Sequence, residues 1–384
     1  MTHQILPAGA YTNVDWFAAE QKHLFGQAWT LVGHRSAFAE TGDFLTITSG
    51  AYPLAVIQDN TGNLRAFHNL CRHRGTELLE GAGNAGKTLV CPYHRWTYGL
   101  DGQLRGLPDR ATCFPDLDRE SLGLHPAAIG VWKGLVFVNP DPTADFDAWL
   151  NTVTDNPFPH DIDSEDMKPS EELVYRMHCN WKVFVENAID GYHLAYLHEH
   201  TLGGPVPGAN EWVQHGENMV WYSTERDGIR NRIPKFIEDQ AAGSGAATVP
   251  GADVPGYGGV YYLFPTTLIT PSPWSLTVSR LIPVSPDETL MRSRTWVPNS
   301  WFAATERAKD APGYSAETGE IDSRNWTQHP LETGDFQTED IWVCEKMQRS
   351  LLGARYAVGP LARGAGGEEL LPAFQRILAN YMSD

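Results

Sequence analysis

The chain has 384 residues, a formal net charge of −18 at pH 7 and only five cysteines. With 42% hydrophobic and 11% aromatic residues, it is predicted to be a folded protein of two or three domains. The excess of 47 Asp and Glu over 29 Lys and Arg argues against nucleic-acid or anionic-membrane surfaces. Five cysteines are too few for a disulfide scaffold. Neither a signal peptide nor a membrane span is visible, so we expect a cytoplasmic protein whose thiols stay reduced and can bind metal.

The N-terminal part is predicted to be mostly β. A short amphipathic helix is expected at 13–25. Short strands and turns follow, with apolar runs at 44–48, 54–58, 64–67 and 131–138. The runs 54–58 and 64–67 are expected to form a hairpin. The Pro-containing turn at 139–143 marks a boundary. We therefore expect a β domain at 28–145.

The rest of the chain is predicted to be an α+β domain made of 1–27 and 146–384, with an antiparallel sheet flanked by helices. Strands are expected at 173–179, 260–264, 275–282 and 290–297. Helices are expected at 181–197, 338–352 and 368–381. The Gly-, Ala- and Pro-rich stretch 240–259 is interpreted as a surface loop.

Two short motifs in the β domain each offer one thiolate and one imidazole. They are C-x-H at Cys71 and His73, and C-x2-H at Cys91 and His94. Two such loops can converge on one metal centre. A tetrahedral zinc site fits this donor set, and so does a Rieske [2Fe–2S] cluster with both cysteines on one iron and both histidines on the other.

The residues around these donors resemble the two ligand loops of Rieske domains, Cys71-Arg72-His73-Arg74-Gly75 and Cys91-Pro92-Tyr93-His94-Arg95-Trp96. The resemblance implies a [2Fe–2S] cluster with Cys71 and Cys91 on the inner iron and His73 and His94 on the outer one. Neutral imidazoles make such a cluster less anionic and raise its reduction potential. Trp96 is expected to shield it from water.

A second set of donors lies in the α+β domain. His193 and His198, with a carboxylate from elsewhere, would form the facial triad of non-haem Fe(II) oxygenases. Five positions on a helix separate two side chains by roughly 140°, so the helix must end or distort near His198. A surface helix that is rich in histidine is the alternative.

The segment Asn187-Ala188-Ile189-Asp190-Gly191-Tyr192-His193, followed by His198, resembles the mononuclear iron motif of Rieske non-haem iron oxygenase α subunits, which include the ring-hydroxylating oxygenases. The resemblance implies that His193 and His198 bind Fe(II), with Asn187 and Asp190 as further active-site residues. Asp190 would not be a ligand. It would bridge His193 to His94 of the partner subunit and so form the electron path.

The third iron ligand is expected near the C-terminus, where the candidates are Asp335, Glu339, Asp340 and Glu345. The segment 336–348 resembles the family's Glu-Asp pair at the start of a helix, in which the Asp is the ligand. Asp340 is therefore favoured over Glu339. Acidic residues at a helix start are also stabilised by the helix dipole, so the local pattern alone does not single out Asp340.

The family resemblance implies a small all-β Rieske domain and a larger, helix-grip-like catalytic domain. It also implies a homotrimer or a multiple of it. The chain has no flavin or nicotinamide fingerprint. Electrons from NAD(P)H are therefore expected through a separate flavin and iron–sulfur reductase, with O2 and a small organic molecule as substrates.

The C-terminal part resembles the branch of carnitine, betaine and stachydrine oxygenases, which implies hydroxylation or oxidative N-demethylation of a quaternary ammonium compound. Aromatic residues that could stack on such a cation are Trp212, Trp221, Tyr222, Tyr261, Tyr262 and Phe264. Arg292 and Arg294 could meet a substrate carboxylate. Mono- or dihydroxylation of an aromatic ring is the alternative, and a non-catalytic zinc or iron–sulfur protein is a more distant one.

Overall fold

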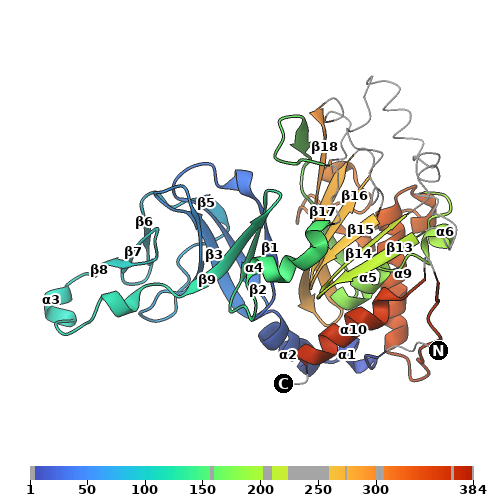
Figure 1. Cartoon of the computed structure of the whole chain (residues 1–384), viewed down its shortest axis with the longest axis horizontal. Coiled ribbons are helices and arrows are strands. Elements are labelled where there is room, and N and C mark those ends of the chain that lie inside the picture. Colours follow the sequence, from blue (N-terminus) through green and yellow to red (C-terminus); the bar gives the residue numbers. More distant parts are fainter. Residues whose placement is uncertain are drawn as a thin grey trace. The chain divides into compact units, whose positions relative to one another are not determined.

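The computed structural model describes residues 5–155, 160–201, 210–223, 259–272, 275–299, 302, 307–364 and 367–382. The chain divides into two compact units (Figure 1), one of Glu20–Ala148 and one of Met1–Ala19 with Trp149–Asp384. The loop expected at 240–259 lies outside the described residues except for Gly259. No helix in the described part of the chain is long and apolar enough to cross a membrane.

The smaller unit is built from two antiparallel sheets. The seven-stranded sheet has the order β1-β10-β9-β4-β3-β2-β5, and the three-stranded sheet has the order β6-β7-β8. The strands are β1 (Thr30–His34), β2 (Asp43–Ser49), β3 (Tyr52–Gln58), β4 (Leu64–His68), β5 (Ala82–Asn84), β6 (Thr88–Val90), β7 (Thr97–Gly99), β8 (Leu104–Gly106), β9 (Pro126–Trp132) and β10 (Leu135–Asn139). The expected strand at 44–48 and the expected hairpin of 54–58 with 64–67 are confirmed.

The apolar run 131–138 is not one strand, because a tight turn divides it between β9 and β10. Trp132 pairs with Leu135 across that turn. The two turn residues, Lys133 and Gly134, have φ of 48° and 75°. Two successive left-handed residues match the twist of a two-residue hairpin, so the run folds back on itself. Periodicity does not reveal this turn, because the apolar pattern resumes directly after Gly134.

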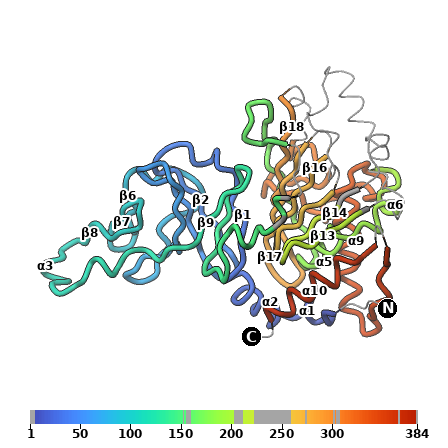
Figure 2. Tube along the Cα trace, viewed as in Figure 1, coloured from blue at the N-terminus to red at the C-terminus, as the bar shows by residue number. Residues whose placement is uncertain are grey.

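The larger unit contains a nine-stranded sheet with the order β13-β14-β15-β16-β17-β18-β12-β19, in which β11 also pairs with β18. Strands β13 to β18 run as an antiparallel meander (Figure 2), and β12 pairs with β19 in parallel. The strands are β11 (Met167–Pro169), β12 (Leu173–Met177), β13 (Asn210–His215), β14 (Asn218–Ser223), β15 (Gly259–Leu263), β16 (Thr267–Pro271), β17 (Leu276–Ser285), β18 (Glu288–Pro298) and β19 (Ile321–Asp322).

Two helices pack on one face of this sheet. Phe374 of α10 contacts Tyr262, with ring centroids 5.7 Å apart, and Trp221 Nε1 donates to the Ala188 carbonyl at the end of α5 at 3.0 Å. Strand alternation places Trp221 and Tyr262 on the same face. The α-helices in the described part of the chain are α1 (Gly9–Thr12), α2 (Val14–Ala19), α3 (Arg110–Cys113), α4 (Phe146–Leu150), α5 (Trp181–Ala188), α6 (Leu194–Leu197), α9 (Phe336–Leu351) and α10 (Leu370–Tyr381). A sheet with helices confirms the expected α+β class.

The helix expected at 181–197 is wrong in its length. Helix α5 ends at Ala188, and the chain is helical again only in the single turn of α6. Asn180 begins α5, since its side chain accepts a hydrogen bond from Lys182 N at 3.0 Å. The expected helix at 13–25 is α2 followed by a π-helical turn at Glu20–Leu24.

Candidate metal centres

The two Cys/His loops of the smaller unit have the same backbone frame. In both loops the cysteine N–H donates to the carbonyl five residues later, at 2.8 Å. Each cysteine carbonyl accepts from the N–H four residues later, at 2.9 and 3.1 Å. That fourth residue is Gly75 in one loop and Arg95 in the other, with φ of 76° and 58°. The left-handed conformation explains the glycine at position 75, and Arg95 adopts it with a side chain.

The cysteines of these loops are buried and not in disulfides. Cys71 is 3% exposed and Cys91 is 1% exposed. Tyr98 Oη lies 3.4 Å from Cys71 Sγ and accepts from Arg72 N at 3.0 Å, so it could donate its own proton to a deprotonated sulfur. Burial raises the pKa of the Cys71 thiol, whereas metal binding would stabilise its thiolate. Tyr98 was not identified from the sequence, because no metal-ligand pattern includes it.

The histidines of the two loops face one another. His73 Nδ1 and His94 Nδ1 are 3.2 Å apart. Trp96 stacks on the His73 ring with centroids 4.8 Å apart, and Phe114 contacts both rings edge-on. Burial, followed by the nearby His94 and Arg74, lowers the pKa of His73 and favours the neutral imidazole that binds metal. Two imidazole nitrogens directed to one point, together with two buried thiols, fit the donor set of a Rieske cluster.

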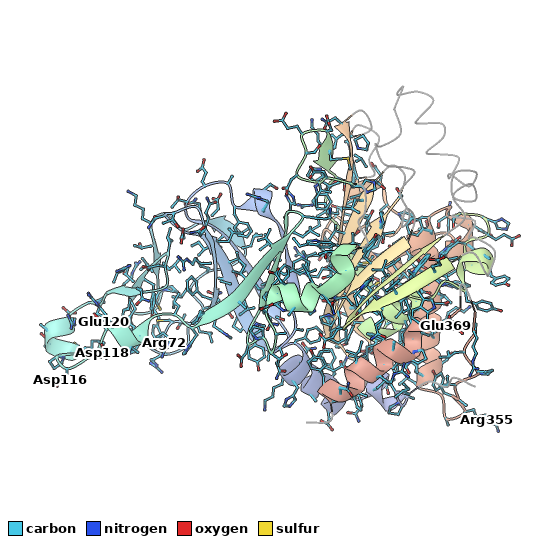
Figure 3. The ribbon with its side chains drawn as sticks, viewed as in Figure 1. Arg72, Asp116, Asp118, Glu120, Arg355 and Glu369 are labelled. Atoms are coloured by element: carbon cyan, nitrogen blue, oxygen red, sulfur yellow. The ribbon has the colours of Figure 1, made fainter. Side chains whose placement is uncertain are left out.

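Part of the negative charge of the chain lies beside these loops. Asp116, Asp118 and Glu120 are exposed and follow α3 at one end of the smaller unit (Figure 3). Arg72, whose guanidinium donates to Gly123 O at 2.7 Å, lies at the same end. This end of the smaller unit therefore carries exposed carboxylates.

In the larger unit, three donor groups converge. His193 directly precedes α6, His198 directly follows it, and Asp340 lies near the start of α9. Their ligand atoms all lie within 4.8 Å of one another. Asp340 Oδ1 is 3.5 Å from His193 Nε2 and 3.1 Å from His198 Nε2. Two imidazoles and one carboxylate at this spacing fit a non-haem Fe(II) site that leaves positions open for substrates.

Hydrogen bonding and charge both hold Asp340 toward the imidazoles. Asn187 Nδ2 donates to Asp340 Oδ1 at 2.8 Å. Burial raises the pKa of Asp340, but the opposing effect of His198 and His193 is larger, so the pKa lies well below its usual range. Burial lowers the pKa of His193, whereas Asp190 and Asp340 raise it, to about 10 overall. A metal cation would replace the protons that these imidazoles hold in its absence.

Each imidazole of this set is also held from its Nδ1 side. His193 Nδ1 lies 3.2 Å from Asp190 Oδ2, and His198 Nδ1 lies 2.6 Å from Glu339 Oε2. With Nδ1 bonded to a carboxylate, Nε2 remains for a metal. Glu339 is therefore directed at the far side of His198 and not at the point where the three donors meet.

The other two carboxylates considered as ligands have different partners. Asp335 begins α9, because its Oδ1 accepts from Gln337 N at 2.9 Å and its Oδ2 accepts from Thr338 Oγ1 at 2.6 Å. Glu345 lies further along the helix and is buried. Neither belongs to the group that His193 and His198 form with Asp340.

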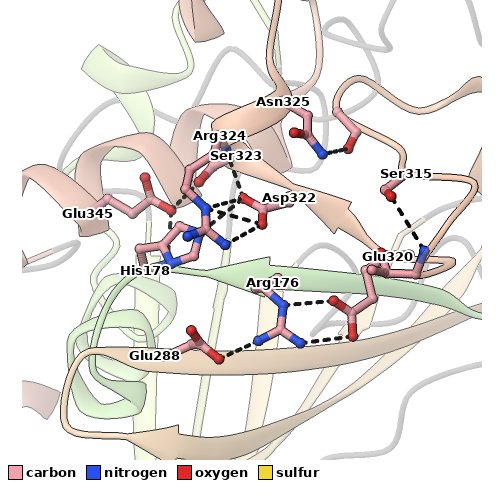
Figure 4. A network of polar contacts seen from close by, with 12 residues as sticks. Arg176, His178, Glu288, Ser315, Glu320, Asp322, Ser323, Arg324, Asn325 and Glu345 are labelled. Carbon is pink, nitrogen blue, oxygen red and sulfur yellow. Dashed lines mark hydrogen bonds and ion pairs between the residues drawn. The ribbon is translucent and has the colours of Figure 1, made fainter.

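Glu345 instead belongs to a polar network that connects α9 with the sheet (Figure 4). Glu345 Oε1 accepts from His178 N at 2.9 Å and from Ser323 Oγ at 2.6 Å. His178 Nε2 lies 3.0 Å from Asp322 Oδ1, and Arg324 also donates to Asp322. The end of β12 and the segment after β19 are thus bonded to the helix that carries Asp340.

A second buried carboxylate, Glu186 of α5, was not identified from the sequence. Its Oε1 accepts from Tyr11 Oη at 2.6 Å and from Gln375 Nε2 at 2.8 Å. Burial raises the pKa of Glu186 to about 7, against the opposing effect of these two donors and of Lys182. This cluster joins α1, α5 and α10, and Glu186 directly precedes Asn187, the residue that contacts Asp340.

The aromatic residues proposed to stack on a cation are mostly core residues. Tyr261, Tyr262 and Phe264 are at most 1% exposed, and Trp221 bonds to the Ala188 carbonyl. Only Trp212 is substantially exposed, at 42%. The side chain of Tyr222 lies outside the described residues. These residues do not form a cage in the described part of the chain.

Arg292 and Arg294 lie on the sheet face opposite α10. Both flank Ser293, which shares a face with Tyr262 through the strand register. Arg292 Nη1 is 3.1 Å and Arg294 Nη2 is 4.0 Å from Glu172 carboxylate oxygens. The arginines therefore pair with Glu172 on that face, and their geometry gives no support to a substrate-carboxylate role.

Comparison with protein families agrees with this pair of centres. The model of the Rieske [2Fe–2S] domain matches residues 28–118, and the model of the ring-hydroxylating α-subunit catalytic domain matches residues 164–384. The chain therefore belongs to the family of Rieske non-haem iron oxygenases, with a [2Fe–2S] domain and a catalytic domain that uses mononuclear iron.

Three relatives show which members of this family have sequences similar to this chain. The choline monooxygenase of Beta vulgaris is 26% identical over 93% of this chain and 74% of its own length. The glycine betaine monooxygenase oxygenase subunit of Chromohalobacter salexigens is 27% identical over 93% and 82%. The carnitine monooxygenase oxygenase subunit of Escherichia coli K12 is 28% identical over 99% and 94%.

Solved structures show the same fold. The quaternary ammonium Rieske monooxygenase CntA, in complex with its substrate L-carnitine, has a TM-score of 0.73 at 24% identity, covering 98% of this chain and 95% of that chain. A naphthalene 1,2-dioxygenase with bound indole has a TM-score of 0.71 at 20% identity, covering 100% and 94%. The fold is thus common to enzymes that act on very different substrates.

Proposed function

We propose that this chain is the oxygenase component of an enzyme that hydroxylates a quaternary ammonium compound of the betaine type, at carbon or by oxidative N-demethylation. The observation that carries the proposal is the likeness to choline, glycine betaine and carnitine monooxygenases along 93–99% of this chain. The ring-hydroxylating alternative is supported by the match to the ring-hydroxylating α-subunit model and by the fold shared with naphthalene 1,2-dioxygenase, and not by the likeness to the relatives named above.

The catalytic iron is proposed to be held by His193, His198 and Asp340, supported by the convergence of their ligand atoms within 4.8 Å. Bound iron would supply the chemistry that activates O2. The chain contributes the arrangement of the donors: Asn187 directs the Asp340 carboxylate, and carboxylates on the Nδ1 side direct both imidazoles.

The cluster is proposed to be held by Cys71, Cys91, His73 and His94. The matching backbone frames of the two loops support this assignment, as do the burial of both thiols and the approach of the two Nδ1 atoms. Trp96 is proposed to exclude water from this centre, because it is 3% exposed and covers one imidazole face.

Asp190 is proposed to connect the two kinds of centre across a subunit interface. Its Oδ2 contacts His193 Nδ1, and its Oδ1 accepts from Tyr192 N at 2.6 Å. In a homotrimer, Asp190 would also reach His94 of the partner subunit. Electrons from NAD(P)H are proposed to enter through a separate flavin and iron–sulfur reductase.

Substrate-dependent NADH consumption with a surrogate reductase tests the function. The panel should contain carnitine, glycine betaine, choline and aromatic acids, with formaldehyde measured in parallel. A hydroxylated N-methyl group breaks down to formaldehyde, so NADH consumption coupled to formaldehyde would support N-demethylation. Consumption coupled to a hydroxylated aromatic acid, with none for the quaternary amines, would overturn the proposed substrate class.

Purified protein tests the metal content independently of substrate. A coloured protein with acid-labile sulfide and additional iron is expected. A colourless protein that contains zinc and no sulfide would overturn the oxygenase proposal. The Asp340→Ala and His193→Ala variants should keep the visible cluster spectrum and lose turnover.

A further inference from the structure

We infer that Glu339 is the positioning residue for the His198 imidazole and that Thr201, through a hydrogen bond, keeps the Glu339 carboxylate in place. Glu339 Oε2 lies 2.6 Å from His198 Nδ1 and accepts from Thr201 Oγ1, also at 2.6 Å. The inference rests on the iron site of the proposed function and adds to it a residue that binds no metal itself.

The burial of the contact between Glu339 and His198 strengthens it. The side chains of His198 and Glu339 are each 1% exposed, so water does not compete for either partner. A charge-assisted hydrogen bond is stronger in such an interior than at the surface. The bond from Nδ1–H to the carboxylate sets the tautomer, which leaves the Nε2 lone pair for a metal.

Glu339 also links the positions of two proposed iron ligands, His198 and Asp340. It is the immediate neighbour of Asp340 on α9, and successive helical residues point about 100° apart. The same turn of helix therefore directs Asp340 Oδ1 to His198 Nε2 and Glu339 Oε2 to His198 Nδ1. The imidazole is held from both nitrogens by one rigid segment, so a shift of α9 moves both contacts together.

Asp190 provides a matched control, because it is the corresponding carboxylate on His193. Its contact is longer, at 3.2 Å, and the two side chains are 15% and 17% exposed. A more exposed carboxylate with a longer hydrogen bond should contribute less to holding its imidazole. We therefore assign metal retention to Glu339 to a greater extent than to Asp190.

The test is the loss of mononuclear iron from purified holoprotein to the Fe(II) chelator ferrozine under anaerobic conditions. The variants are E339A, E339Q, T201V, D190N and D340A, and the visible cluster spectrum is followed throughout. For E339A, iron affinity is expected to fall by about 10- to 100-fold. E339Q should recover most of the loss, because its amide oxygen still accepts from Nδ1–H. T201V and D190N should have smaller effects.

The outcomes distinguish a failure of the positioning role of Glu339 from a failure of the proposed iron site. Wild-type iron retention in E339A would overturn the positioning role. Equal losses in E339Q and E339A would indicate that Glu339 is itself a ligand, and would overturn it as well. Wild-type retention in D340A would contradict the proposed iron site. If E339A does not fold, E339Q and T201V still decide the question, because both retain side chains of similar volume.

Discussion

Asn187 and Asp340 are 153 positions apart in the sequence and are joined by a hydrogen bond of 2.8 Å between Asn187 Nδ2 and Asp340 Oδ1. This bond connects the last turn of α5 to the first turns of α9. Asp340 Oδ1 is also the atom that lies near both imidazoles. Asn187 thus limits the rotation of the carboxylate that is proposed to bind iron.

Removal of this donor is expected to impair catalysis without affecting the cluster. A hydrogen bond to a charged group contributes about 1.5–3 kcal/mol, so Asn187→Ala should lower turnover by roughly 10- to 100-fold. Turnover, iron content and cluster absorbance are the measurements. Wild-type turnover in the variant would show that Asp340 needs no support from Asn187.

Asp190→Ala should separate metal binding from electron transfer. Both metals are expected to remain, because Asp190 is not among the converging ligand atoms. Reduced protein mixed with substrate and O2 should then fail to reoxidise its cluster in a single turnover, as followed by visible absorbance. Reoxidation at the wild-type rate would contradict the proposed bridge between subunits.

Tyr98→Phe is expected to lower the reduction potential of the cluster. Tyr98 Oη lies 3.4 Å from Cys71 Sγ, and when Cys71 is a thiolate only the hydroxyl can donate in this contact. A hydrogen bond to a ligand sulfur stabilises the more electron-rich, reduced state. A potentiometric titration followed by visible absorbance measures the shift. The native spectrum should persist in the variant, which checks that the cluster is still bound, and an unchanged potential would exclude this role for Tyr98.

Glu186 should make the catalytic unit less stable as the pH rises. Its pKa rises from an ordinary 4.5 to about 7 in the folded chain. Between these values the folded form holds a proton that the unfolded form has released, so stability falls through this window and stays lower above it. Glu186→Gln keeps the acceptor for Tyr11 and Gln375 and removes the charge.

We therefore expect Glu186→Gln to be more stable than the wild type at pH 8, by about 1–3 kcal/mol, and similar to it at pH 5. Urea unfolding at both pH values, followed by tryptophan fluorescence, is the measurement. Gln375→Leu is a useful comparison, because it removes a donor and leaves the titrating group. A wild-type advantage at pH 8 would mean that the pKa of Glu186 is not raised in the folded protein.

The class of fold and the donor residues could be predicted from sequence because they depend on local patterns. Strand alternation predicted four of the nine strands of the larger sheet, β12, β15, β17 and β18. Short Cys/His spacing predicted two loops that face one centre. The end of α5 could not be predicted this way, since apolar residues continue beyond Ala188. At the break, the Ala188 carbonyl accepts a hydrogen bond from the indole N–H of a residue distant in sequence, Trp221.

The choice between Glu339 and Asp340 shows the same limit. Both acids lie at the start of one helix, where each is favoured by the helix dipole. Only the position of His198 relative to α9 distinguishes them, because one carboxylate reaches Nε2 and the other reaches Nδ1. Contacts of this kind join segments about 140 residues apart, and local spacing contains no information on them.

The equal backbone frames of the two Cys/His loops have a consequence for the symmetry of the cluster site. The frames are related as two copies of one turn, yet the histidine stands two positions after Cys71 and three positions after Cys91. The two loops therefore share a main-chain hydrogen-bond pattern and differ in the position of the histidine. Exchanging Tyr93 and His94 would equalise the spacing, and we expect it to separate the two imidazoles, whose Nδ1 atoms now lie 3.2 Å apart. The one-residue offset is therefore what we expect a duplicated turn to need if both histidines are to reach one metal.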